Sequence, residues 1–282
     1  MSGNLSIEVV QSPWLEAILA DPIEKTPLER KGNSYHSQSG AVYHIKDGVP
    51  DFRVHINQQE EEWNKGQDAY ESWMNSYFDR GEKNIGHYPG EKQRDAPMYE
   101  KLSLEGKVLD VGGNLGAIRQ YMCESQEYCS VDPFITVPKL ATGRKRFFEN
   151  YPMHKPINFI GGFAEFLPFK DSSFQTVNMR SCIDHFFDPK HSLLEANRVL
   201  SENGKLIIGM TVDVKSAKNF LKEAARSVLN IFTDRYKDDH IWHPSRKDIV
   251  ELCNECGFAL EDEIWQNENV WYASFRKTAI QL

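Results

Sequence analysis

The sequence predicts an α/β fold built on a parallel sheet, with a small β-rich module at the N-terminus. A short apolar run ends in glycines within residues 107–116, and a second apolar run ends in an acid further along the chain. Strand-like runs then alternate with helical patterns towards the C-terminus. Because this alternation is typical of parallel α/β sheets, we expect the fold to be organised around the first of these runs.

The stretch KVLDVGGNLG at 107–116 reads as a buried strand that ends in a tight turn, and residues 117–122 read as a helix. Such a unit presents backbone N–H groups at a helix N-terminus to a ligand. Asp132 closes the second strand, where an acid can bond a ribose hydroxyl group. Together the two elements predict an adenosine site.

The spacing of the glycines argues against a dinucleotide such as NAD. A dinucleotide fingerprint would place glycines at 112, 114 and 117. The chain instead has Gly112, Asn114 and Ala117, with further glycines at Gly113 and Gly116.

The order of acid, glycine, small residue and glycine at Asp110, Gly112, Asn114 and Gly116 resembles the first motif of the class I S-adenosylmethionine-dependent methyltransferases. Four later segments resemble successive motifs of the type 11 branch of that family: GGFAEFLPFKDSSFQTV (161–177), MRSCIDHFFDP (179–189), EANRVLSENGKLIIGM (195–210) and the helix ending in CGF (256–258). The resemblance implies a Rossmann-like, seven-stranded, mostly parallel sheet with helices on both faces. A reversed last strand would lie between two parallel strands, and S-adenosyl-L-methionine would be the cofactor.

The resemblance also implies which residues bind the cofactor. They lie at and after the strand ends: Asp110, Gly112, Gly113, Asn114, Gly116, Asp132, Pro133, Phe163, Ala164, Arg180 and Ser181. Asp110 is expected to orient the loop and to receive the amino group of the cofactor. Asn114 replaces the commoner glycine, and Asn tolerates positive φ better than other residues with a side chain. Phe163 replaces an aspartate that bonds adenine in many relatives, so we expect Phe163 or Phe134 to pack on the ring. Glu165 is expected to be solvated.

Methyl transfer needs alignment, and a base if the acceptor must lose a proton. His185 is the candidate base because its unperturbed pKa lies near neutrality. The alternative is a histidine that only packs beside the cofactor. His240 and His243, in the segment 238–248, are the rival bases, and Cys182 as a methyl-accepting nucleophile is a further alternative.

Residues 1–59 are expected to form the small β-rich module. The segment SGAVYHIKDGVPDF (39–52) resembles the zinc-ribbon-like module that activates some methyltransferases. In that module two cysteine pairs hold zinc, but here their positions fall on Asp21, Glu24, His36 and Ser39. We therefore expect no metal, and a module held by packing against its neighbour.

Residues 60–100 are expected to form a helical linker or lid before the methyltransferase domain at 101–282. Aromatic residues occur at helical spacing: Tyr70, Trp73, Tyr77 and Phe78. They form either an ordinary core stripe or the face of a lid over the site, with Tyr88 as a candidate contact. An inserted helix at about 215–232 is interpreted as a substrate cap or a dimer interface, with a membrane-surface helix as the alternative.

The C-terminal part is expected to close the sheet. Ser245 and Asp248 predict a capped helix, and Cys253 and Cys256 read as two half-buried thiols on it. Two strands at 258–265 and 270–276 would then form a hairpin.

Composition narrows the function further. The 282 residues carry a formal net charge of −8, which makes a nucleic-acid partner unexpected, and a dense basic patch occurs only at Lys139, Arg144, Lys145 and Arg146. Neither a signal pattern nor a membrane-spanning run is evident, so we expect a cytoplasmic protein. Five cysteines argue against a disulfide framework.

The leading hypothesis is therefore methyl transfer from S-adenosylmethionine to oxygen or nitrogen of a small molecule, such as a sugar or a secondary-metabolite intermediate. The alternatives are a ribosomal RNA methyltransferase and a non-catalytic binding module that keeps the methyltransferase fold. A homodimer is the expected state if the inserted helix forms an interface.

Overall fold

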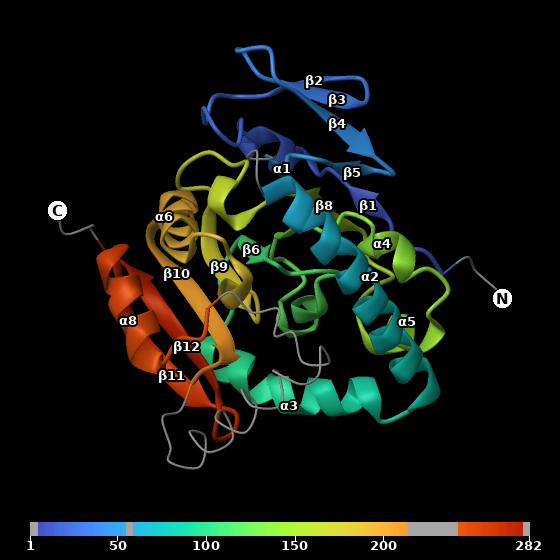
Figure 1. Cartoon of the computed structure of the whole chain (residues 1–282), viewed down its shortest axis with the longest axis vertical. Coiled ribbons are helices and arrows are strands. Elements are labelled where there is room, and N and C mark those ends of the chain that lie inside the picture. The colour runs from blue at the N-terminus through green and yellow to red at the C-terminus, as the bar shows by residue number, and fades with distance from the viewer. Residues whose placement is uncertain (1–4, 55–58, 214–241, 279–282) are drawn as a thin grey trace.

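An eight-stranded sheet runs through the centre of the computed structural model, which describes residues 5–54, 59–213 and 242–278 (Figure 1). The strand order is β1-β8-β7-β6-β9-β10-β12-β11. In this order the bounds are Val9–Val10, Ile157–Gly161, Tyr128–Asp132, Val108–Val111, Phe174–Arg180, Leu200–Thr211, Val270–Lys277 and Phe258–Trp265. The sheet is parallel from β1 to β10, while β12 pairs antiparallel with both β10 and β11.

The expected fold is confirmed, including the reversed strand, which is β12. One difference lies at the edge of the sheet, where β1 from the N-terminal region pairs in parallel with β8. The sequence did not predict β1, because its two residues are too few to show the alternation that identifies a strand. The hairpin of β11 and β12 is also as predicted.

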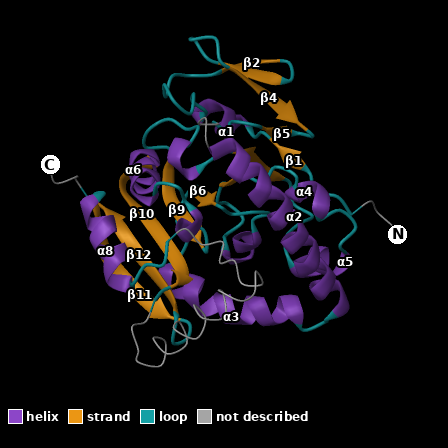
Figure 2. Cartoon of the chain, viewed as in Figure 1, coloured by secondary structure: helices purple, strands orange, loops and turns teal. Residues whose placement is uncertain are grey.

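Helices cover both faces of the sheet (Figure 2). They are α1 (Pro13–Ile18), α2 (Gln59–Lys83), α3 (His87–Leu102), α4 (Val137–Leu140), α5 (Lys145–Asn150), α6 (Pro189–Val199) and α8 (Arg246–Glu255). Three 3-10 helices complete the set: η1 (Ala117–Tyr121), η2 (Ala164–Phe166) and η3 (Ile183–His185). The largest core cluster joins the sheet to α1, α6 and α8, and a second joins it to α3 and η1.

Local sequence signals explain where two of these helices begin. The Asp188 side chain accepts a hydrogen bond from the amide of His191 at the start of α6. Ser245 and Asp248 form the predicted capping box of α8. The expectation of half-buried thiols on α8 was wrong, because Cys253 and Cys256 are both fully buried in the core beneath it.

A four-stranded antiparallel sheet forms the N-terminal region. Its strands are β2 (Glu29–Lys31), β3 (Ser34–His36), β4 (Val42–Lys46) and β5 (Val49–Pro50). Asp21, at the first expected cysteine position, accepts hydrogen bonds of 2.8 Å from the amides of Ile23 and Glu24 and from the Tyr43 hydroxyl group. A carboxylate thus organises the turn by hydrogen bonds. Within the described ranges no three His, Cys, Asp or Glu side chains group as metal ligands.

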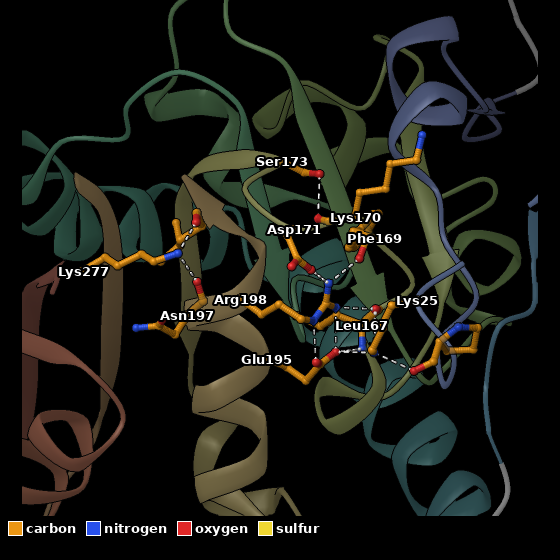
Figure 3. Close-up of polar contacts among 12 residues, drawn as sticks. Lys25, Leu167, Phe169, Lys170, Asp171, Ser173, Glu195, Asn197, Arg198 and Lys277 are labelled. Atoms are coloured by element: carbon orange, nitrogen blue, oxygen red, sulfur yellow. Dashed lines mark hydrogen bonds and ion pairs between the residues drawn. The ribbon is translucent and has the colours of Figure 1, made fainter. Parts of the chain in front are cut away.

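A partly buried ion cluster joins this region to α6 (Figure 3). Lys25 Nζ lies 2.6 Å from Glu195 Oε2 on α6, and Arg198 holds the same carboxylate with bonds of 2.7 and 2.9 Å. Burial opposes ionisation of Glu195, but the hydrogen bonds from Arg198 and the charge of Lys25 lower its pKa. The N-terminal region is therefore fixed to α6 by charge as well as by packing.

Candidate functional site

The polar residues predicted to bind the cofactor gather at the carboxyl ends of three neighbouring strands. Asp110 lies near the end of β6, Asp132 ends β7, and Arg180 ends β9. In open α/β sheets, ligands bind beyond this edge.

In the described part of the chain no helix is long and apolar enough to cross a membrane.

Asp110 is buried beneath the glycine loop, and protein donors reach both of its oxygens. Tyr128 donates to Oδ2 and Asn178 to Oδ1, each over 2.7 Å. Burial raises the pKa of Asp110 to about 6, although both hydrogen bonds act in the opposite direction. In this structure Asp110 thus joins β6 to its two neighbours, β7 and β9, beneath the loop.

The glycines let the loop turn closely over these groups. Gly112 has a φ of 65° and donates its amide to Val131, and a Cβ there would lie 2.7 Å from Cys182 Cβ. A Cβ on Gly113 would lie 2.3 Å from the Asp110 carboxyl carbon. Any side chain at either position would push the loop away from the strand ends. Gly116 has a φ of 71°, and a Cβ there would lie 2.8 Å from the Tyr128 hydroxyl oxygen.

Asn114 occupies its position with a φ of 49°, in the left-handed region that Asn tolerates. Its amide donates to Asp132 Oδ2 over 3.0 Å, and its carbonyl group accepts from the Ser130 hydroxyl group. The side-chain Oδ1 accepts the amide of Leu115, and Nδ2 donates to the Tyr70 hydroxyl group over 2.6 Å. The side chain that departs from the family pattern therefore ties the loop to α2.

Asp132 is 2% exposed, and its two oxygens accept the amides of Asn114 and Phe134. Burial raises its pKa to about 7, against the lowering effect of those two hydrogen bonds. The carbonyl group of Pro133 accepts a hydrogen bond of 3.1 Å from Arg53, so the N-terminal region reaches this side of the site.

Aromatic rings stand next to Asp132. Tyr70 and Phe134 stack with their centroids 3.7 Å apart and an interplanar angle of 11°. Phe163 is half-buried after β8, and Ala164 is buried. The prediction for Glu165 was wrong: it is 7% exposed, and its Oε1 accepts the amides of Phe187 and Asp188. Glu165 therefore fixes the loop that follows η3.

The polar groups at the end of β9 have partners within the protein. Arg180 pairs with Asp95 of α3 over 2.6 Å and donates to the Tyr272 hydroxyl group over 2.9 Å. Ser181 has a φ of 51° and donates its amide to Gly209. The Cys182 alternative loses support, because burial raises the pKa of its thiol well above the usual value and its Sγ lies 3.2 Å from the Val111 carbonyl oxygen.

Of the three candidate bases, His185 and His243 lie in the described part of the chain, in neighbouring segments. The side chain of His185, in η3, is 45% exposed, and its Nε2 lies 4.0 Å from Asp184 Oδ1. The amide of Trp242 bonds the Asp184 carbonyl oxygen, which brings the segment of exposed His243 towards η3. His240 and the inserted helix at 215–232 lie outside the described residues.

The residues of the aromatic stripe on α2 differ in their surroundings. Phe78 is buried in the core, whereas Tyr70 lies against the glycine loop and Trp73 is exposed. Tyr88, the candidate contact for methionine or substrate, is 1% exposed, and its ring packs in the core against Phe147.

Sequence reasoning missed Tyr128 and Asn178, which donate to Asp110, and Asp95, which pairs with Arg180. A signal for one of them existed, since Asn178 interrupts an apolar strand. A polar residue at such a position must find a buried partner.

The chemistry of these residues fits an S-adenosyl nucleoside. A carboxylate has about four lone-pair sites, so Asp132 can accept ribose hydroxyl groups in addition to its two amides. The rings of Phe134 and Phe163 offer flat apolar surfaces to a base. The glycine loop keeps side chains away from a ligand beside Asp110.

Comparison with known proteins gives the family. A family model described as "Methyltransferase domain" matches residues 87–263. The ubiquinone/menaquinone biosynthesis C-methyltransferase UbiE of Ruegeria sp. (strain TM1040) is 33% identical over 103 residues, 36% of this chain and 41% of that protein. The uncharacterized methyltransferase YcgJ of Bacillus subtilis (strain 168) is 31% identical over 110 residues, 37% and 40% of the two chains. The chain thus spans about two fifths of the length of these curated relatives.

A solved structure shares the fold. A chain in the complex between the Haloferax volcanii Trm112 methyltransferase activator and a methyltransferase superposes with a TM-score of 0.53 at 13% identity, covering 77% of this chain and 99% of that one. Together with the family match over more than half of its length, this shows that the chain belongs to the class I S-adenosylmethionine-dependent methyltransferases.

Proposed function

We propose that the protein transfers a methyl group from S-adenosyl-L-methionine to oxygen or nitrogen of a small-molecule acceptor. The observation that carries this proposal is the meeting of Asp132 with the loop of Gly112 and Asn114 at neighbouring strand ends. When bound, S-adenosylmethionine supplies an electrophilic methyl group on its sulfonium sulfur.

The residues of this chain bind and orient the reactants. Asp132 accepts the ribose hydroxyl groups, and Phe134, Phe163 and the backbone at Ala164 hold the base. The loop from Gly112 to Gly116 admits the amino-acid part above Asp110. Arg180 and Ser181 end the neighbouring strand on the acceptor side.

His185 is the proposed base for an acceptor that must lose a proton. It is exposed enough to meet a substrate, and the carboxylate of Asp184 lies beside it. We expect His185→Ala to slow turnover far more than it weakens cofactor binding. Unchanged turnover would move the base to His243 or His240, or remove the need for one.

A small acceptor is favoured over RNA by charge. The formal net charge is −8, and Arg144 and Lys145 of the dense basic patch are paired with Asp79 and Glu149. Nucleic-acid binding relies on basic groups that neutralise phosphates. RNA binding with a steep salt dependence would reverse this choice.

Binding of S-adenosylhomocysteine tests the proposal against a non-catalytic role. At 100 times its Kd the ligand adds about 2.7 kcal/mol of stability, a shift of several degrees in Tm. A radiolabelled methyl donor in a cell extract then identifies the acceptor pool as small molecules, RNA or protein. Because UbiE is named a C-methyltransferase, mass spectrometry of the product should also consider carbon. The absence of any shift would contradict the proposed function.

A further inference from the structure

Tyr70 of α2 lies against the predicted ribose site, although it comes from a helix outside the strand ends. Its hydroxyl oxygen accepts a hydrogen bond of 2.6 Å from Asn114 Nδ2. Asn114 Oδ1 is already used by the amide of Leu115, so the orientation of the side-chain amide is fixed and the Tyr70 oxygen is the acceptor.

The hydroxyl proton of Tyr70 remains available. A phenol both accepts and donates, and among the residues whose side chains the structure describes (5–54, 69–213 and 242–278) none accepts the proton of this one. Burial, together with the charge of Asp132, raises the pKa of Tyr70 far above its usual value, so the proton is retained. Tyr70 is half-buried, and a ligand oxygen beside it would accept this proton.

Two contacts place this donor beside Asp132. Asn114 donates its backbone amide to Asp132 Oδ2 and its side-chain amide to the Tyr70 hydroxyl group. The carboxylate and the phenol are therefore both bonded to Asn114. The Tyr70 ring also stacks on Phe134, whose amide bonds the other oxygen of Asp132. The donor and the carboxylate therefore lie close to each other, since both contact Asn114 and Phe134.

We propose that Tyr70 is a cofactor-binding residue whose hydroxyl group donates a hydrogen bond to a ribose oxygen of the bound nucleoside. This rests on the proposed function, because it assumes that Asp132 receives the ribose. A ribose hydroxyl group would then donate to Asp132 and accept from Tyr70. Through this contact α2 becomes one wall of the cofactor site.

The test is calorimetric titration of the full chain with S-adenosylhomocysteine and with 5′-methylthioadenosine, which keeps the ribose but lacks the amino-acid part. Tyr70→Phe removes one oxygen atom and keeps the ring on Phe134. We expect it to weaken both ligands by about fivefold to tenfold, as for one lost hydrogen bond. Tyr77→Phe is the matched control, because Tyr77 on the same helix donates to Glu91 instead. It should change neither affinity by more than about twofold.

An indirect effect through the loop is separated by Asn114→Gly, which keeps the left-handed turn but removes the amide that holds Tyr70. Tyr70→Phe should weaken binding by the same factor in this background. A loss that disappears there would mean that Tyr70 acts only by holding Asn114, and would overturn the direct bond.

The remaining outcomes are equally decisive. Unchanged affinities in Tyr70→Phe, with or without a lower Tm, would leave Tyr70 a packing residue only. Weaker binding of S-adenosylhomocysteine alone would assign the contact to the amino-acid part and overturn the ribose assignment. A wild-type chain that binds neither ligand would overturn the proposed function together with this inference. If the wild-type chain binds both ligands and Tyr70→Phe binds them equally well, only the inference about Tyr70 is overturned.

Discussion

The side-chain amide of Asn178 on β9 donates a hydrogen bond of 2.7 Å to the carboxylate of Asp110 on β6. Both side chains are buried, and Tyr128 of β7 donates to the second oxygen of the same carboxylate. Residues of three neighbouring strands thus meet on one acid under the glycine loop. The loop depends on this acid, because Gly113 packs directly against its carboxyl group.

We expect Asn178→Ala to raise the pKa of Asp110 further above its value of about 6, because one of the donors to the charged form is lost. The free energy of unfolding should fall by about 1–3 kcal/mol at pH 8, where the carboxylate is ionised. The loss should be smaller at pH 5, where Asp110 is mostly protonated. Chemical denaturation at the two pH values measures this, with exposed Asn254→Ala as the control. Equal losses at both pH values would show that only packing was disturbed.

Stability should depend on pH through Asp132 as well. Its pKa is raised from 3.8 to about 7 in the folded chain, so between these values the folded state binds a proton that the unfolded state has lost. Stability therefore falls as pH rises from about 4 to about 7, by at most about 4 kcal/mol from this group. Asp132→Asn should flatten this part of the curve measured by denaturation. An unchanged slope would mean that Asp132 is ionised throughout.

The sequence predicted the central elements because each carries a strong local signal. Within residues 107–116, the glycines that follow the apolar run predicted the site loop. Ser245 and Asp248 predicted the start of α8. The order of β10, β12 and β11 followed from the family resemblance rather than from any local pattern.

The corrections concern burial and pairing, which depend on distant residues. Glu165 reads as a solvated loop acid until the amides of Phe187 and Asp188 cover it. Arg180 was placed correctly at a strand end, but its partner Asp95 lies on a helix 85 positions earlier, where no sequence spacing connects them.

Arg180 and Asp95 should be strongly coupled. Asp95 is buried, so Arg180→Met would leave its carboxylate with Arg94 and Gln266 as its remaining side-chain partners among the described residues. We expect a loss of about 2–4 kcal/mol in the free energy of unfolding. Adding Asp95→Asn should recover part of it, since the unpaired charge is removed. Lys101→Met breaks the exposed pair with Asp262 and should leave Tm unchanged. Additive losses in the double variant would show that the two residues act independently.

Arg53 offers a test of how the N-terminal region supports the site. Its guanidinium group lies between Asp51, which it holds with two bonds of 2.8 Å, and the carbonyl group of Pro133 next to Asp132. Arg53→Ala should lower Tm and weaken S-adenosylhomocysteine binding several-fold, because the turn that carries Asp132 loses a buried contact.

Lys46→Ala is the matched control, since Lys46 holds the same Asp51 carboxylate from an exposed position and does not touch Pro133. It should leave ligand affinity unchanged. Arg53→Lys keeps the charge but cannot bridge Asp51 and Pro133 with a planar fork, so its affinity should lie near that of Arg53→Ala. If Arg53→Ala lowers Tm while titration gives the wild-type Kd, the N-terminal region stabilises the fold without shaping the cofactor site.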